Sequence, residues 1–249
     1  MLRSLALWAL GYPEAARAGT EQALSHARET ERAGTLMQTI AITSLIQLIG
    51  SNYAMAKAQS DELLALAEER GSIFWKTVGM IRRACFLALT GKTSDAVSIF
   101  ISAIPAYRST GSRLFIPVYL LILARACGEL GQLGDAWGYI AETMTAVEKT
   151  KEKWCEAEVH RVAGEIALMS QERDEARAQV YFERALEIAR QQQAKSWELR
   201  AAMSMAQLWR DQGKRDEARE LLAPVYGWFT EGFDTLDLKQ AKVLLDELA

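Results

Sequence analysis

The run Gly213-Lys214-Arg215-Asp216-Glu217-Ala218 decides the fold, because it is one copy of a motif that returns about every forty residues. A glycine followed five positions later by an alanine also occurs at Gly91 and Gly131, and related copies begin at Gly11 and Gly50. The intervals between these glycines are 39, 41, 40 and 82 residues, and the last spans two periods. Self-similarity at a fixed period of this length indicates a stacked repeat array.

Each copy of the motif is expected to form the turn between the two helices of a repeat. The glycine ends the first helix in a left-handed conformation, and the small residue lets the second helix approach closely. A small or apolar residue follows the first position of each copy by five positions, as Ala16, Met55, Ala96, Ala136, Ala176 and Ala218, and the close approach is predicted at Ala96, Ala136, Ala176 and Ala218. One glycine is missing near Gln171, where the polar run Ser170-Gln171-Glu172-Arg173 replaces it.

The composition favours helices throughout the 249 residues. Only four prolines interrupt the chain, 50% of its residues are hydrophobic, and stretches of alternating β-branched residues are absent. We therefore predict an all-α solenoid of about six helix-turn-helix repeats, forming one superhelical domain over residues 1–249. The repeats are predicted at 1–31, 35–70, 74–110, 113–150, 154–192 and 195–231, followed by a C-terminal capping helix at 234–248.

The repeats resemble those of the tetratricopeptide family, whose usual period is about 34 residues, so longer helices are expected here. Two C-terminal segments give a more specific resemblance: the run Ala194-Lys195-Ser196-Trp197-Glu198-Leu199-Arg200-Ala201-Ala202 and the segment from Leu222 to Thr235. They are similar to the C-terminal repeat region of bacterial multidomain signalling proteins, in which P-loop ATPase and often class III adenylate cyclase domains accompany the repeats. The resemblance implies a sensing or assembly arm, and it carries over no catalytic residue.

No motif for catalysis or for a cofactor stands out. Gly91-Lys92-Thr93 resembles the end of a phosphate-binding loop, but Phe86 occupies the position where that loop needs its first glycine. The two histidines, His26 and His160, are far apart, and no metal-binding motif is present. We expect no catalytic residue, no cofactor and no metal.

Charge and apolar content also limit the partners. The net charge is −3, without the concentrated lysine and arginine of a nucleic-acid-binding surface. The most apolar segment, 40–49, is too short to cross a bilayer. Three cysteines in apolar stretches, without paired spacing, suit a reducing compartment. We therefore expect a cytoplasmic protein that binds neither nucleic acid nor membranes.

One helix face suggests a binding site. Trp154, Glu158 and Arg161 share one face of a predicted helix, because they are spaced by four and three residues. In tetratricopeptide arrays the first helices line a concave groove, which implies that further residues of neighbouring helices join this face. The predicted groove residues are Arg82, Tyr119, Arg125, Trp154, Glu158, Arg161 and Arg200. They would clamp an acidic peptide or a small anion; in the alternative interpretation Trp154 packs between repeats and Glu158 pairs with Arg161.

These features predict a non-catalytic protein-interaction or sensing scaffold that acts as the regulatory arm of a signalling ATPase or cyclase. One alternative is a stand-alone adaptor that forms homodimers through its N-terminal helix, where Leu5 and Trp8 lie without a preceding cap. That helix also suggests the tail of a longer array. Another alternative is a sensor domain that binds a small-molecule effector.

Overall fold

The computed structural model describes residues 1–170 and 173–249, and within these ranges it contains thirteen α-helices and no strand. The all-α prediction is confirmed, whereas Gln171 and Glu172, where the motif glycine is missing, lie outside the described residues. The helices are α1 (Leu2–Ala9), α2 (Pro13–Glu29), α3 (Ala33–Ile49), α4 (Tyr53–Glu69), α5 (Ile73–Leu89), α6 (Thr93–Ser109), α7 (Ile116–Glu129), α8 (Leu133–Thr150), α9 (Glu156–Leu168), α10 (Glu175–Gln191), α11 (Lys195–Asp211), α12 (Arg215–Tyr226) and α13 (Leu236–Glu247).

Long helices account for the long period. Helices α3, α4 and α5 each contain 17 residues, and they begin at residues 33, 53 and 73. Two such helices with their turns therefore fill forty residues, compared with about 34 in the usual tetratricopeptide repeat.

The turns between the two helices of a repeat share one feature. A residue with positive φ precedes a buried alanine by five positions, in the pairs Gly11 and Ala16, Ser51 and Ala56, Gly91 and Ala96, Gly131 and Ala136, Arg173 and Ala178, and Gly213 and Ala218. At Gly131 the backbone N–H donates to the Gly128 carbonyl, and the Gln132 N–H donates to the Cys127 carbonyl, both over 2.9 Å. These bonds satisfy carbonyls that the helix end would otherwise leave unpaired.

The close approach predicted at Ala176 is wrong, because Ala176 is exposed and Ala178 is buried in its place. Met55, five positions after Gly50, is 44% exposed, and the buried position in that repeat belongs to Ala56. In the second repeat the reason is the backbone, because Gly50 has a φ of −81° and Ser51 takes the left-handed conformation at 60°.

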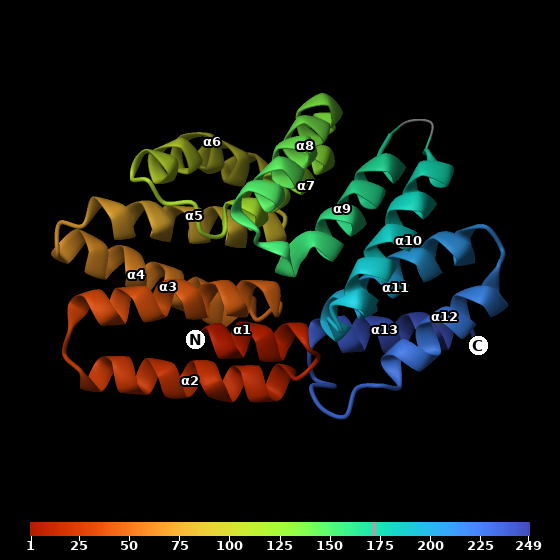
Figure 1. The fold of residues 1–249 in the computed structure, drawn as a ribbon, viewed down its shortest axis with the longest axis horizontal. Coiled ribbons are helices and arrows are strands. Elements are labelled where there is room, and N and C mark those ends of the chain that lie inside the picture. Colours follow the sequence, from red (N-terminus) through yellow and green to blue (C-terminus); the bar gives the residue numbers. More distant parts are fainter. Residues whose placement is uncertain (171–172) are drawn as a thin grey trace.

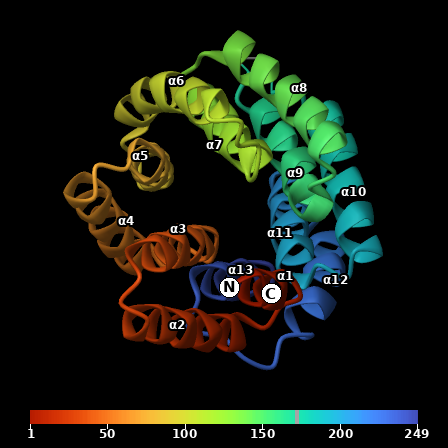
Figure 2. The ribbon, with the colours of Figure 1, turned by 60° about the vertical axis from the view of Figure 1, so that its left-hand side comes forward.

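The repeats curve into a ring. In Figure 2 the colours run once around it, with α3, α5, α7, α9 and α11 inside and α2, α4, α6, α8, α10 and α12 outside. Figure 1 shows the same molecule from another side, with α1 lying next to the C-terminal helices. The inner helices thus face a common interior.

The first and last repeats close the ring through direct contacts. The Trp8 and Trp197 rings meet edge to face with centroids 4.6 Å apart, and the Ser196 hydroxyl donates to the Trp8 carbonyl. A carboxylate oxygen of Glu231 accepts from the Glu14 N–H over 2.9 Å, and Glu14 in turn accepts from the Gly232 N–H over 2.8 Å. We call this set of contacts, which joins residues 8–14 to residues 196–197 and 231–232, the clasp.

The clasp changes the interpretation of the N-terminal helix. Leu5 is 8% exposed and Trp8 is 4% exposed, because α1 packs against α2, α3 and α11. The apolar face that suggested a dimer contact is therefore covered within the chain itself. Only Leu2 remains a large exposed apolar side chain on α1, at 61%.

Candidate functional site

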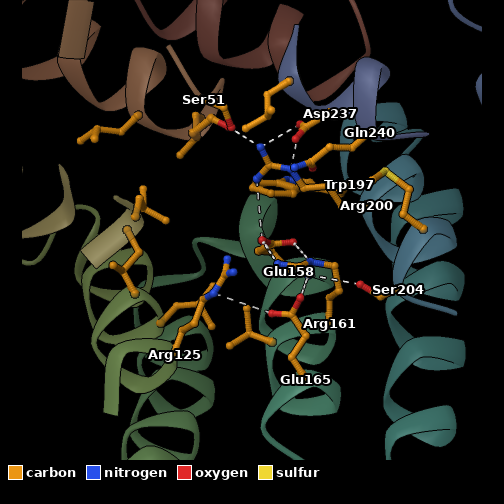
Figure 3. Close-up of a pocket in the computed structure, with 18 of the residues that line it drawn as sticks. Ser51, Arg125, Glu158, Arg161, Glu165, Trp197, Arg200, Ser204, Asp237 and Gln240 are labelled. Carbon is orange, nitrogen blue, oxygen red and sulfur yellow. Dashed lines mark hydrogen bonds and ion pairs between the residues drawn. The ribbon is translucent and has the colours of Figure 1, made fainter. Parts of the chain in front are cut away.

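A cavity of about 350 Å³ opens on the inner face of the ring. Its walls come from α3, α4, α5, α7, α9, α11 and α13, so elements far apart in the sequence contribute to it (Figure 3). Four of the predicted groove residues line the cavity: Arg125, Glu158, Arg161 and Arg200. Its volume falls within the range of small-molecule sites.

Arg161 and Glu158 form the centre of the cavity wall. The Arg161 Nε and Nη2 atoms each donate to one carboxylate oxygen of Glu158 over 2.7 Å, which is a bidentate pair within α9. Arg161 also donates to Glu165 and to the Ser204 hydroxyl, the latter over 3.2 Å. Its side chain is only 8% exposed, so its charge is used within the protein.

Neighbouring charges determine the protonation states of Arg161 and Glu165. Burial alone would lower the pKa of the Arg161 guanidinium, but Glu158 and Glu165 hold it above its ordinary value. Burial alone would raise the pKa of the Glu165 carboxyl, but Arg161 and then Arg125 bring it below its ordinary value. Arg161 and Glu165 therefore keep their charges at physiological pH.

Arg200 connects the cavity to the clasp. Its Nε donates to Asp237 Oδ2 over 2.8 Å, and its Nη2 donates to the Ile49 carbonyl, 151 residues away in sequence. The guanidinium carbon also lies 5.2 Å from the ring centroids of both Trp8 and Trp197. One side chain thus contacts α1, α3, α11 and α13.

Arg125 differs from the other two arginines. Its Nε donates to Glu129 Oε1 over 3.1 Å and lies 3.9 Å from Glu165 Oε2. Neither of its terminal nitrogens has a hydrogen-bond partner among the described residues, and its side chain is 39% exposed. Figure 3 shows this guanidinium pointing into the cavity. Arg125 therefore offers a free pair of donors there.

Arg82 and Tyr119 lie away from the cavity, in the core. Both are 1% exposed, and the Arg82 Nη1 donates to the Tyr119 hydroxyl over 2.7 Å. The Arg82 Nε donates to the Ala41 carbonyl over 2.9 Å, so this arginine joins three repeats. Two groups without accessible surface cannot contact a ligand on the inner face, and their role is to hold repeats together.

Trp154 also packs between repeats and does not line the cavity. Its ring lies 6.4 Å from that of Phe115 and 6.2 Å from that of Trp197, while its carbonyl accepts from the Trp197 Nε1 over 2.8 Å. This is the arrangement of the alternative interpretation. Trp154 therefore positions Trp197, which does line the cavity.

Sequence reasoning missed several residues of the cavity, above all Asp237, Gln240 and Ser204. Asp237 and Gln240 belong to α13, which the sequence marks only as a cap. Nothing local in the sequence indicates that this helix faces the inner wall, because its position depends on closure of the ring.

The three cysteines are buried and His160 is half-buried, and none of them lines the cavity. Burial raises the pKa of the Cys85 thiol to about 12 and that of Cys127 to about 11. Burial, with the charge of Arg184, lowers the pKa of His160 below its ordinary value. Among the described residues no three His, Cys, Asp or Glu side chains come together as a metal site would require. None of the described helices is both long and apolar enough to pass through a membrane.

No protein-family model matches the chain, and no curated protein matches its sequence. Among solved structures it is similar to BtubC (BKLC) from P. vanneervenii, with 16% sequence identity and a TM-score of 0.57 over 92% of this chain and 90% of that chain. Two structures of kinesin light chain TPR-like repeats from Podosopora anserina follow. The first has 16% identity and a TM-score of 0.52 over 77% of this chain and 93% of that one. The second has 15% identity and a TM-score of 0.50 over 87% and 98%.

The chain has a tetratricopeptide-like fold. The likeness at these identities concerns the fold alone, and the cavity residues are features of this sequence.

Proposed function

We propose that the chain is a non-catalytic interaction and sensing scaffold, which recognises its partner or ligand on the inner face of the ring. The observation that carries the proposal is the cavity, where Arg125 presents free donors beside side chains that are already ordered by one another. A general base works best with a pKa near the working pH, whereas Arg161 and Arg125 bring the pKa of Glu165 below its ordinary value despite burial. The cavity is thus suited to binding.

Photo-crosslinking from inside and outside the ring tests this proposal. A benzophenone amino acid replaces Gln207, which lines the cavity, or Val180 on α10, which is 63% exposed. In the native cells the inner position should give a discrete crosslinked product that the outer position does not give. Equal labelling from both positions, or no product from the inner one, would overturn recognition on the inner face.

The finer proposal is that this scaffold is the regulatory arm of a bacterial signalling ATPase or cyclase. It is supported by the resemblance of the segments 194–202 and 222–235 to the repeat regions of such proteins. An antibody against this chain measures the size of the native protein in its own cells. A band several times larger than 27.7 kDa supports the regulatory arm, and a band near 27.7 kDa contradicts it in favour of a stand-alone adaptor.

The homodimer alternative now depends on a different residue. Since Leu5 and Trp8 are buried inside the ring, the apolar surface left on α1 is Leu2. Sedimentation of the wild type and of Leu2→Ser should show a dimer that the substitution dissociates. A monomeric wild type would remove this alternative.

A sensor for a small effector is the second candidate function, and one observation favours it. The cavity volume of about 350 Å³ suits a small molecule better than a long peptide segment. The connection of Arg200 to the clasp supplies a route by which occupancy of the cavity changes the contact between the two ends of the array.

A further inference from the structure

The charges on the cavity wall limit what the cavity can bind. Three arginines and three carboxylates line it: Arg125, Arg161, Arg200, Glu158, Glu165 and Asp237. A wall with balanced charges favours a ligand without net charge, because a polyanion would meet the carboxylates and a polycation the arginines. A ligand that carries one charge of each sign satisfies this condition.

Among the charged groups that line the cavity, Arg125 and Asp237 are opposite in sign and both retain free hydrogen-bonding capacity, as does the buried Oε2 of Glu165. The terminal nitrogens of Arg125 have no partner in the described structure, and their planar fork fits a carboxylate. Asp237 accepts from Arg200 through Oδ2, and its Oδ1 accepts no hydrogen bond in the part of the chain described. The Asp237 side chain is 18% exposed, so this oxygen is able to receive an ammonium group.

The two free groups lie at separate ends of the cavity. Figure 3 shows Arg125 on α7 at one end and Asp237 on α13 at the other, with Glu158 and Arg161 between them. A free α-amino acid carries both charged groups on a single carbon atom, so it cannot span two groups at opposite ends of the cavity. The charges of the ligand must therefore be separated by an intervening body.

The other residues that line the cavity indicate the chemistry of the part of the ligand between its two charges. One wall is apolar and is formed by α3, α5 and α7, with Leu48, Leu89, Val118, Leu121 and Ile122. Gln207 and Gln240 add amide groups that make no hydrogen bond to other described residues. Apolar side chains and free amides together suit a body with apolar substituents and a peptide group.

We propose that the inner cavity binds a short zwitterionic peptide of the dipeptide class with apolar side chains. Its carboxylate binds the Arg125 fork and its ammonium binds Asp237 Oδ1. This inference rests on the proposed function, since it names the ligand class of the same inner face. The ligand would share Asp237 with Arg200, because its ammonium binds Oδ1 while Arg200 donates to Oδ2, and Arg200 in turn contacts Trp8 and Trp197 of the clasp.

Calorimetric titration of the purified full chain with leucyl-leucine tests the proposal. Leucyl-leucine amide lacks the carboxylate, N-acetyl-leucyl-leucine lacks the ammonium, and free leucine lacks the separation between the charges. Each of the three should bind about ten- to a hundredfold more weakly than leucyl-leucine, as expected for the loss of one charge-assisted contact. Equal affinities for leucyl-leucine and either modified form would overturn the assignment, and so would the absence of binding.

Variants assign the two ends of the ligand. Arg125→Gln should weaken leucyl-leucine to the level of its amide and leave the amide itself unaffected, while Arg83→Gln, at an exposed arginine of α5, should change neither. Asp237→Asn should weaken leucyl-leucine to the level of N-acetyl-leucyl-leucine and leave the affinity for the N-acetyl form unchanged. If this variant does not fold, the titrations of the wild type with the N-acetyl form test the ammonium end of the ligand. Losses that are the same for every ligand would overturn the pairing of ends. Failure here leaves the crosslinking from Gln207 intact, so the ligand class and the scaffold function are tested separately.

Discussion

Gly164 offers a sharp test of how closely the two helices of a repeat pack. It lies in α9 against Phe182 of α10, whose ring is 1% exposed. A Cβ atom added at Gly164 would lie 2.7 Å from Phe182 Cδ1 and 3.0 Å from Cζ, and still closer to Cε1. These are separations that real Cβ atoms almost never show. The Gly164→Ala variant therefore forces the ring or the helix to move.

Two opposing effects determine the magnitude. Alanine in place of a helical glycine stabilises a helix by about 0.5–1 kcal/mol. Overpacking a filled core costs about 1–3 kcal/mol. Because the Phe182 ring is rigid and enclosed, we expect Gly164→Ala to lower the free energy of unfolding by about 1–2 kcal/mol.

Gly138 supplies the matched control. It lies within α8, it is exposed, and an added Cβ there would have no atom within 4 Å. Gly138→Ala should therefore raise the free energy of unfolding by about 0.5–1 kcal/mol. The difference between the two variants isolates the contact with Phe182.

Urea unfolding of the wild type and both variants measures the effect, followed by far-ultraviolet circular dichroism and by tryptophan fluorescence. Two probes are needed because repeat arrays can depart from two-state unfolding. If Gly164→Ala gains as much stability as Gly138→Ala, the ring moves aside without cost. The argument that α9 and α10 require a glycine at this contact would then be refuted.

Three further predictions concern the clasp and titratable groups whose pKa is shifted by burial. Trp8→Ala should lower the free energy of unfolding by about 3–5 kcal/mol, as expected when a buried tryptophan is truncated. Amide hydrogen exchange should become faster in α1 and stay unchanged in α5, and equal acceleration throughout the chain would contradict a local clasp. Since burial lowers the pKa of His160 below 6.5, the unfolded chain takes up a proton before the folded one. Stability should thus fall as the pH drops below about 6.5, less steeply in His160→Gln than in the control His26→Gln, and equal slopes would disprove this origin. Cys85 and Cys127, whose pKa values are raised by burial to about 12 and about 11, should resist iodoacetamide near pH 8 until urea is added, and a fast reaction of the folded protein would be inconsistent with their burial.

The helical repeat was predictable because its signals are local. A turn residue and an alanine five positions later appear within one short segment, as at Gly131 and Ala136. In the second repeat the motif is offset by one residue, because the glycine was expected to take the left-handed conformation and Ser51 does so instead.

The cavity was only partly predictable for a related reason. Glu158 and Arg161 lie three residues apart on one helix, so their pairing follows from local geometry. The burial of Arg82 depends on the Ala41 carbonyl, 41 residues earlier, and on Tyr119, 37 residues later. The position of Asp237 depends on contacts between the two ends of the array. Contacts between residues so far apart in the sequence produce no periodic pattern from which they could be predicted.

The clasp also alters how this array should respond to loss of a repeat. In an open solenoid each repeat touches only its neighbours, so the outermost units unravel first and the middle persists. Here the outermost units shield each other, through Trp8 on one side and Trp197 on the other. Deletion of a terminal repeat therefore removes contacts from two other repeats, the one next to it in sequence and the one at the opposite end of the array. The repeats therefore form a closed ring, and the repeat that unfolds most easily does not have to be the first or the last one.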